Sequence, residues 1–314
     1  MLPTLSQIES SQQIVYSVLP PTPQYCWPLL CERLGAEVWL KHENHTPVGA
    51  FKVRGGLVYF ADLSGVKEVV TATRGNHGQS VALSARRYGI AATIVIPFGN
   101  SVEKNNAMRA FGAKLIEHGE DFQAAREYAT QLAEESGAHM VSSFHPLLVQ
   151  GVATYGVELF RACRDLEAVY VPIGLGSGIC GTIAVRNALS PRTKVIGVVS
   201  AHARAYALSF ASKRAIESPV TTQLADGVAC RTPHPDALEV IWKYVDRIVE
   251  VTDDEIAEAM RLIFECTHNT AEGAGAAAVA AIARERNEVK GRKVAAILTG
   301  GNVDRPVFAR VLSG

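Results

Sequence analysis

Short apolar runs alternate with amphipathic segments along most of this chain, a pattern typical of strands and helices that follow one another in a parallel α/β sheet. From residue 66 onward, helix-period segments begin near Asn76, Val102 and Phe122, with apolar runs between them. The predicted strands of this part are VKEVVTAT, AATIVIP, AKLIEH and HMVS. The pattern predicts one compact α/β unit.

A second series of apolar runs begins near residue 168. It predicts four further strands, AVYVPIGL, KVIGVVS, RIVEVT and KVAAILTG, again with helix-compatible segments between them. Thr252 followed by Glu255 is a capping box, which predicts a helix that starts near Asp253. The predicted fold class is therefore α/β, with two parallel or mostly parallel sheets flanked by helices.

The first 30 residues combine a polar, helix-compatible stretch with the segment PPTPQYCWP, whose prolines favour an extended arm. This region is too short for a domain, so we expect the residues before about 65 to pack with the second sheet. The predicted organisation is a discontinuous large domain, residues 1–65 and 146–314, and a small domain, residues 66–145.

Composition excludes several classes of protein. The chain has 314 residues, of which 48% are apolar and 20% are charged, as in an ordinary globular protein of about two domains. The 31 basic residues balance the 31 acidic ones, so no overall field favours nucleic acid or a membrane surface as a partner. The longest uncharged run, residues 168–185, contains Pro172 and several glycines and favours a strand and loop over a membrane helix.

Two features favour a cytoplasmic location. No basic residue precedes Arg33, so the start of the chain lacks the positive region of a secretory signal. The six cysteines include no CxxC pair, and we interpret them as reduced thiols in packing positions.

The loop PIGLGSGICG, residues 172–181, lies between a predicted strand and a predicted helix, so its free amides form a candidate anion site. A phosphate is the ligand we expect. Gly176, Gly178 and Gly181 also satisfy the dinucleotide pattern GxGxxG, but that reading needs an acidic residue at the tip of the next strand, and none occurs near Ser200. A turn needed only for close helix packing is the remaining alternative.

Two more glycine-rich turns follow predicted strands. In TRGNHGQS, residues 73–80, the backbone suits a carboxylate and Asn76 offers an amide hydrogen bond. His77 could act as a base, although a histidine at a helix start is also a common structural hydrogen-bonding residue. The third turn is LTGGNVD, residues 298–304. Ligands of parallel sheets bind at such strand ends.

Lys52 lies between Phe51 and Val53, an apolar setting that would lower the pKa of its ammonium group. By itself the residue could be an ordinary surface lysine. Together with a phosphate loop, a carboxylate loop and a turn that carries a hydroxyl, it meets the needs of pyridoxal phosphate, which binds a lysine as a Schiff base.

Five motifs in this sequence resemble those of the pyridoxal-phosphate-dependent serine/threonine dehydratase and serine racemase family, which has the tryptophan-synthase-β-like fold (fold type II). LKHENHTPVGAFKVRGG resembles the lysine motif, TRGNHGQS the substrate loop, GLGSG the phosphate cup, EGAG the late glutamate motif and LTGGN the pyridine-nitrogen turn. They occur in the family's order and span residues 40–304.

The resemblance implies a role for each matching residue. Lys52 would form the Schiff base and later act as the acid/base, Asn76 would bond the phenolic oxygen of the cofactor, and Thr299 would face its pyridine nitrogen. The phosphate would be held by Gly174, Leu175, Gly176, Ser177 and Gly178. The substrate would be bound by Thr73, Arg74, Gly75, Asn76 and His77. A hydroxyl at position 299 leaves the ring nitrogen largely unprotonated, which favours prompt loss of a β-leaving group.

The implied activity is β-elimination of water from a β-hydroxy amino acid, giving a 2-oxo acid and ammonia. Serine and threonine are the default substrates, and phenylserine and 3-hydroxyaspartate compete with them. The implied assembly is a homodimer. A β-replacement synthase is the first alternative, although RGNHG resembles the dehydratase loop more closely. A non-catalytic amino-acid sensor is the second, but it would be expected to lose Lys52 or the phosphate loop.

Several positions depart from the family's pattern. Ala50 replaces a usual serine, and GVAT at 151–154 replaces a GQGT stretch, which affects fine geometry. Racemase-like members bind a divalent cation through acidic residues at the positions of Val199 and Ala205, so we expect no metal site. The chain ends ten residues after Asp304, so we expect no C-terminal regulatory domain.

Arg74 is the departure nearest to the expected chemistry. It stands where a racemase carries a serine that handles the α-proton, and a guanidinium is a poor proton shuttle near neutral pH, so we expect no racemase activity. Arg74 either points away and pairs with an acidic side chain, or lies beside the substrate or cofactor. In the second case it would pair with an anionic group or stack on an aromatic one.

Overall fold

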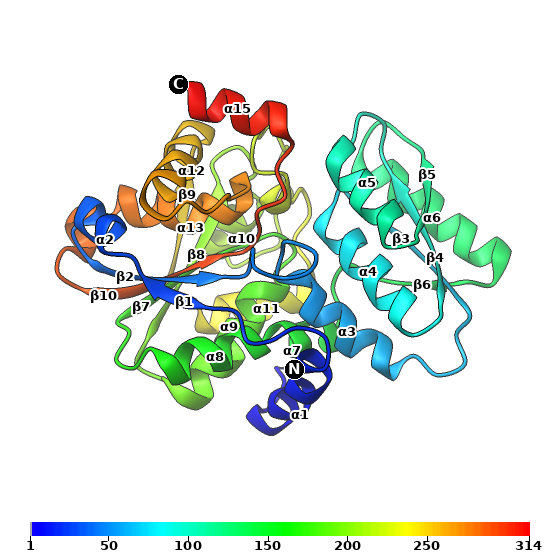
Figure 1. Ribbon diagram of the computed structural model, residues 1–314, viewed down its shortest axis with the longest axis horizontal. Helices are drawn as coiled ribbons and strands as arrows, with labels where there is room; N and C mark the ends of the chain where they lie inside the picture. Colours follow the sequence, from blue (N-terminus) through cyan, green and yellow to red (C-terminus); the bar gives the residue numbers. More distant parts are fainter. Residues whose placement is uncertain (1) are drawn as a thin grey trace.

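The computed structural model describes residues 2–314, which form two sheets flanked by helices (Figure 1). The larger sheet has the strand order β1-β2-β10-β7-β8-β9 and the smaller one β5-β4-β3-β6. Every described pair of neighbouring strands is parallel except β1 and β2, which are antiparallel. The predicted α/β class with mostly parallel sheets is confirmed.

The strands are short, as is usual in such sheets. Those of the large sheet are β1 (Gln24–Cys26), β2 (Glu37–His42), β7 (Ala168–Pro172), β8 (Lys194–Ser200), β9 (Arg247–Val251) and β10 (Lys293–Leu298). Those of the small sheet are β3 (Glu68–Ala72), β4 (Ala91–Ile96), β5 (Lys114–Glu117) and β6 (His139–Met140). All eight strands predicted from the two series of apolar runs are present.

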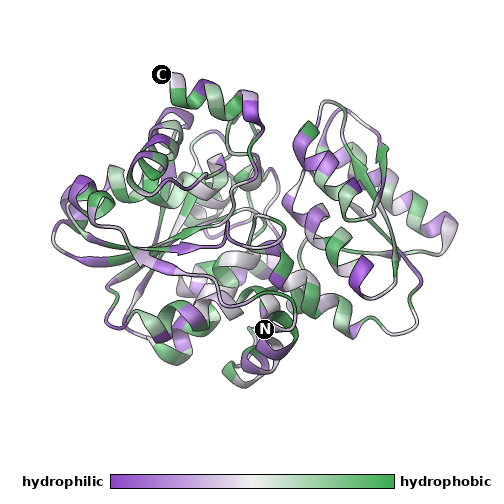
Figure 2. Cartoon of the chain, in the orientation of Figure 1, coloured by the Kyte–Doolittle hydropathy of each residue, from purple (hydrophilic) through white to green (hydrophobic). Residues whose placement is uncertain are grey.

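Three helices pack on the small sheet, namely α4 (Asn76–Arg87), α5 (Val102–Ala110) and α6 (Phe122–Ser136). They begin at the residues that the sequence predicts. Figure 2 shows hydrophobic residues along the strands of this sheet, while hydrophilic residues are frequent on its helices. The strands are therefore buried beneath the helices.

Helices cover both faces of the large sheet. On one side lie α2 (Pro28–Leu34), α12 (Asp253–Thr267), α13 (Gly273–Arg284), α14 (Arg286–Val289) and α15 (Arg305–Ser313). The other side carries α7 (Pro146–Val152), α8 (Thr154–Ala162), α9 (Ser177–Leu189), α10 (Ala205–Ser212) and α11 (Pro235–Tyr244). Near the small domain lie α1 (Leu5–Tyr16) and α3 (Lys52–Asp62), and a 3₁₀ turn covers Asp226–Val228. Among residues 2–314, no helix combines the length and the apolar character needed to cross a bilayer.

The capping box predicted before α12 is present. The amide of Thr252 donates to Glu255 Oε2 at 2.8 Å, and the amide of Glu255 donates to Thr252 Oγ1 at 3.2 Å. Both bonds satisfy amides that the first turn of a helix leaves without partners.

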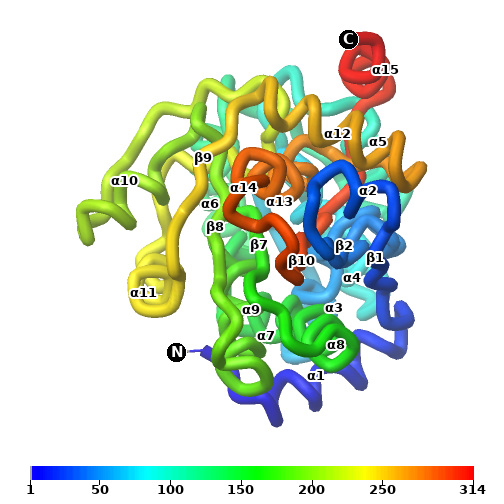
Figure 3. Tube along the Cα trace, turned by 90° about the vertical axis from the view of Figure 1, so that its left-hand side faces the viewer, coloured from blue at the N-terminus to red at the C-terminus, as the bar shows by residue number. Residues whose placement is uncertain are grey.

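The N-terminal segment joins the large sheet, as expected for residues before about 65. The arm contributes β1, in which Gln24 pairs with Lys41 of β2, and β2 in turn pairs with β10 (Figure 3). The pattern alone did not predict these two strands. The division into residues 1–65 with 146–314 and residues 66–145 remains our proposal for the domain boundaries.

A buried ionic cluster ties this segment to the rest of the large domain. The Arg54 guanidinium contacts Glu43 and Glu158, each at 2.7 Å, and Lys41 Nζ lies 2.6 Å from Glu158. Thr22 Oγ1 also donates to Glu43 at 2.5 Å. Since these groups are buried, each charge depends on its partner for stability. Arg54 lies two residues after Lys52 in α3, so the cluster fixes the position of the helix that begins with Lys52.

All six cysteines are free, and four of them are buried, as expected of packing thiols. The other two, Cys26 and Cys31, are half-buried and their sulfur atoms lie 3.3 Å apart. Burial raises the pKa of Cys26 to about 12. Cys26 and Cys31 form no CxxC pair, so the sequence did not indicate this contact. It arises because β1 leads directly into α2.

Candidate active site

A cavity of about 1240 Å³ lies between the two sheets, at the ends of β3, β7 and β10. The three glycine-rich turns predicted as ligand loops all line it, and so does Lys52. The turns after β7 and β10 lie at the same edge of the large sheet, because these strands are parallel neighbours, and the turn after β3 of the small sheet faces them across the cavity. The structure thus brings together every residue that the sequence singled out for cofactor binding.

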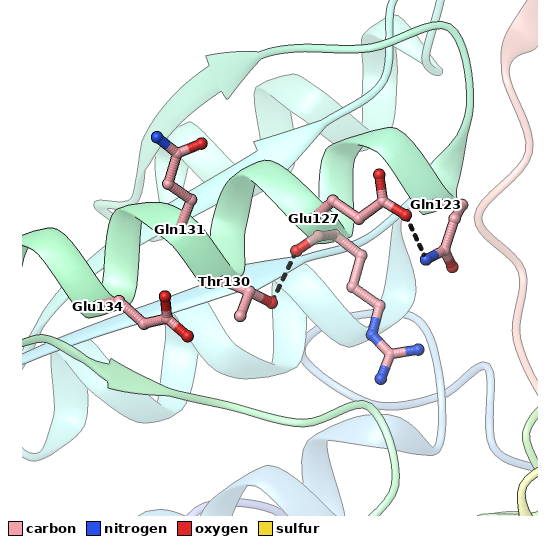
Figure 4. Close-up of a pocket in the computed structure, with 6 residues that line it drawn as sticks. Gln123, Glu127, Thr130, Gln131 and Glu134 are labelled. Atoms are coloured by element: carbon pink, nitrogen blue, oxygen red, sulfur yellow. Dashed lines mark hydrogen bonds between the residues drawn. The ribbon is translucent and has the colours of Figure 1, made fainter.

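A second, smaller depression of about 420 Å³ lies on the surface of α6 (Figure 4). Its labelled residues follow one another along a single helix, and Gln123 donates to Glu127 at 2.9 Å. None of the glycine-rich turns lines this depression. The larger cavity is therefore the candidate active site.

The turn between β7 and α9 leaves a continuous series of amides unpaired. Within the described part of the chain, the backbone N–H groups of residues 174–179 donate no hydrogen bond, whereas Ile173 and Cys180 on either side do. No side chain caps α9, because its N-cap residue is Gly176. Six free amides at the start of a helix form a site for a phosphate dianion.

Glycine is required at two positions of this turn. Gly176 has a φ of 102°, and a Cβ there would lie 2.5 Å from the Cβ of Ala237. A Cβ on Gly174 would lie 2.5 Å from the carbonyl oxygen of Gly227. The glycines therefore let the backbone, with its amides, form the floor of the cavity.

Lys52 reaches this turn from the first position of α3. Its Nζ donates to Ser177 Oγ at 3.2 Å, and burial lowers the pKa of its ammonium to about 8, the direction that its apolar neighbours predict. The main chain beside it is held from two sides. Ser80 Oγ donates to the Lys52 carbonyl at 2.7 Å, and the Phe51 amide donates to the Thr299 carbonyl at 3.0 Å.

Thr299 lies buried at the end of β10 and lines the same cavity. Its hydroxyl contacts no hydrogen-bonding group within residues 2–314, so it is available to a ligand. That it faces the ring nitrogen of a cofactor stays a prediction.

Asn76 takes part in a polar network that the sequence did not predict. Its Nδ2 donates to Glu272 Oε1 at 2.5 Å, and its Oδ1 accepts from Asn302 Nδ2 at 2.9 Å. One N–H of Asn76 Nδ2 is left for a ligand, since an amide nitrogen carries two. Both partners lie inside motifs quoted above, EGAG and LTGGN, but spacing gave no sign that they contact Asn76.

Lys104 crosses from the small domain to complete this network. Its Nζ lies 2.7 Å from Asp226 Oδ2 and 3.2 Å from Glu272 Oε2. Burial alone would lower the pKa of Lys104, but the two carboxylates outweigh it and raise the pKa. At the sequence level Lys104 was indistinguishable from a solvated lysine in the first turn of a helix.

Two of the backbone amides between Gly75 and Gly78 are free and two are occupied. The amides of Gly75 and Gly78 donate to Thr73 Oγ1, at 3.0 and 3.3 Å, so they are occupied. The amides of Asn76 and His77, the first two of α4, have no acceptor among the described residues. The free donors for a carboxylate are therefore these two rather than the glycines.

His77 is buried, and burial lowers the pKa of its imidazole to about 3, with a further contribution from the charge of Lys52. Its Nε2 has no hydrogen-bond partner. The ring is therefore neutral at physiological pH and is no general acid there. Arg74 is exposed and lines the cavity; it forms no salt bridge with residues 2–314, so the pairing with an acidic side chain is not found.

An anion cup, an amine of lowered pKa and a free hydroxyl around one cavity define a pyridoxal-phosphate enzyme. The family model described as "Pyridoxal-phosphate dependent enzyme" matches residues 17–300, and the chain belongs to this family. Pyridoxal 5'-phosphate is therefore its cofactor, and the tryptophan-synthase-β-like fold expected from the motifs is confirmed.

Individual relatives agree with this assignment. The L-threonine ammonia-lyase of Thermotoga maritima is 37% identical, over 99% of this chain and 78% of its own length. The L-threonine dehydratase biosynthetic IlvA of Haemophilus influenzae is 33% identical, over 92% of this chain and 58% of its own. The structure of maize serine racemase superposes with a TM-score of 0.91 at 26% identity, covering 100% of this chain and 98% of that one. This chain therefore spans little more than half the length of the second relative.

Proposed function

We propose that this protein is an ammonia-lyase that eliminates water from a serine- or threonine-type β-hydroxy amino acid and releases a 2-oxo acid and ammonia. The observation that carries the proposal is the position of Lys52 Nζ, 3.2 Å from Ser177 Oγ, at the edge of six unpaired amides. An amine and a phosphate cup at this separation suit a lysine-bound pyridoxal phosphate.

The residues of the cup would hold the cofactor phosphate. Residues 174–178 offer backbone N–H groups, Asn76 has one free N–H for the phenolic oxygen, and the Thr299 hydroxyl is free for the ring nitrogen. When bound, the cofactor supplies an electron-withdrawing ring that acidifies the α-carbon of an amino acid. A hydroxyl at position 299 does not hold a proton on the ring nitrogen as a carboxylate would.

Lys52 and the loop before α4 would act on the substrate. The free amides of Asn76 and His77 at the helix N-terminus bind its α-carboxylate. The Lys52 amine, whose pKa of about 8 keeps a useful fraction neutral near physiological pH, accepts the α-proton at Nζ. The β-hydroxyl group takes up a proton and leaves as water, and hydrolysis of the released unsaturated amine by another water molecule gives the 2-oxo acid and ammonia.

The relatives named for threonine make threonine and serine the first substrates to test, with phenylserine and 3-hydroxyaspartate beside them. The holoenzyme is incubated with each amino acid, and 2-oxo acid and ammonia are quantified in equal amounts. A β-replacement synthase would release product only when a nucleophile is added, and a sensor would release none. Either result overturns the proposal. The homodimer and the cytoplasmic location are carried forward as proposals, and light scattering of the holoenzyme tests the first.

A further inference from the structure

The charged residues that line the cavity are not balanced. The basic ones are Lys52, Arg74, Lys104, Arg126 and Arg231, and the acidic ones are Asp121, Glu217, Asp226 and Glu272. Two of these acids pair with Lys104, and a third, Glu217, lies 3.8 Å from Arg231 at the exposed rim. The fourth, Asp121, caps α6 through the amide of Ala124.

Two guanidinium groups are left over. Neither Arg74 nor Arg126 forms a salt bridge with any carboxylate of residues 2–314. Lys52 is the third unpaired cation, but the proposed function already uses it. The cavity thus has two positive charges, on Arg74 and Arg126, that pair with no carboxylate of the described residues. The proposed function does not use either of them.

The placement of these arginines associates them with the substrate. Arg74 directly precedes Gly75 and Asn76 in the loop whose free amides would bind the α-carboxylate. Arg126 lies on α6 and lines both the cavity and the shallow depression on the surface of that helix. Cations therefore occur in the α-carboxylate loop and on α6, both in the part of the cavity wall that the small sheet and its helices form.

We propose that Arg74, with Arg126 as a second cation, binds an anionic group carried by the β-carbon of the substrate, so that the preferred β-hydroxy amino acid is a dicarboxylate such as 3-hydroxyaspartate. The inference rests on the proposed function and narrows its substrate class. A guanidinium binds a carboxylate through two parallel hydrogen bonds, which adds orientation to charge. A phenyl group could stack on one guanidinium but would leave both charges without a counterion.

The kinetic test compares kcat/KM for serine, threonine, phenylserine and both diastereomers of 3-hydroxyaspartate. We expect the holoenzyme to prefer one 3-hydroxyaspartate, and we expect R74A to lose at least about tenfold more kcat/KM on that substrate than on serine. R74K keeps the positive charge but loses the planar guanidinium group. Its kcat/KM on 3-hydroxyaspartate should therefore lie between those of the wild type and R74A. The matched control is R164A, because Arg164 is also exposed and unpaired but lies outside the cavity.

A binding test needs no turnover. L-aspartate and L-alanine lack a β-leaving group, and titration calorimetry of the holoenzyme measures their affinities. We expect tighter binding of L-aspartate, and a loss of this preference in R74A and, to a smaller extent, in R126A. A uniform loss for all amino acids, together with weaker cofactor binding, would assign Arg74 to the cofactor and overturn the inference.

The two proposals fail in different ways. If no β-hydroxy amino acid yields a 2-oxo acid, the proposed function is wrong. If serine and threonine are eliminated and the ratio between 3-hydroxyaspartate and serine is the same in the wild type and in R74A, only the substrate inference is wrong.

Discussion

Lys52 Nζ and Ser177 Oγ lie 3.2 Å apart, although 125 positions separate them in the sequence. The contact joins the first residue of α3 to the first residue of α9. In the proposed function, the amine that binds the cofactor therefore lies beside the helix N-terminus that would hold its phosphate.

Replacing Lys52 with alanine should abolish turnover and the visible absorption of the lysine-bound cofactor. No other lysine lies in a matching position, so no amine would replace it. Assays of 2-oxo acid release and an absorption spectrum of the purified variant check this. Lys67→Ala, at an exposed position, is the control. Full activity in Lys52→Ala would refute the assignment of the site.

Attachment of the cofactor to the apoprotein should depend on pH. Only the neutral amine attacks an aldehyde, and burial lowers the pKa of Lys52 to about 8. The second-order rate constant should therefore rise about tenfold per pH unit below 8 and level off above about 9. Stopped-flow absorbance at several pH values measures it. A rise that continues to pH 10 would mean that the lysine has its ordinary pKa.

Thr299→Asp should slow elimination relative to side reactions. A carboxylate facing the ring nitrogen favours its protonated form, which prolongs the lifetime of the deprotonated substrate. The ratio of α-deuterium exchange in D₂O to 2-oxo acid release should increase. Thr299→Ser, which keeps the hydroxyl, is the matched control and should leave this ratio near that of the wild type. An unchanged ratio in the aspartate variant contradicts the electronic argument.

Activity should be independent of divalent cations. Val199 and Ala205 are buried apolar residues in and after β8, where racemase-like members carry acidic ligands. Dialysis against a chelator should leave kcat/KM and the thermal midpoint of the holoenzyme unchanged. Loss of activity that magnesium or calcium restores would show a metal site formed by other residues.

Glu158→Ala should lower the free energy of unfolding by about 3–5 kcal/mol, because it leaves Lys41 and Arg54 buried with a single carboxylate. Urea unfolding followed by circular dichroism measures the change. The control is Glu258→Ala, which breaks an exposed salt bridge to Arg261 and should change the stability by less than about 1 kcal/mol. Equal effects of the two substitutions would contradict the importance assigned to the cluster.

Much of the fold could be predicted because hydrophobic periodicity reports local structure directly. The starts of α4, α5 and α6 follow from it, and parallel topology then places each glycine-rich turn at the carboxyl end of its strand. Periodicity does not report which strands become neighbours. The strands β1 and β2 were therefore missed, as was the contact between Cys26 and Cys31.

The candidate site also has features that the sequence could predict and features that it could not. The unpaired amides before α9 could be predicted, because they follow from glycine spacing between a strand and a helix. The contacts of Lys104 could not be predicted, since they depend on how the two sheets are oriented. Spacing also could not show which amides of the loop stay free, because the Thr73 hydroxyl accepts from those of Gly75 and Gly78 at short range.

The position of β10 has a consequence for synthesis on the ribosome. It lies between β2 and β7, so residues 37–42 have no parallel neighbour until residues 293–298 have been made. The small sheet, by contrast, is complete once residue 140 has emerged. A nascent chain therefore carries one finished sheet beside an unpaired N-terminal strand edge for most of its translation, and this edge is the part that a chaperone would have to shield.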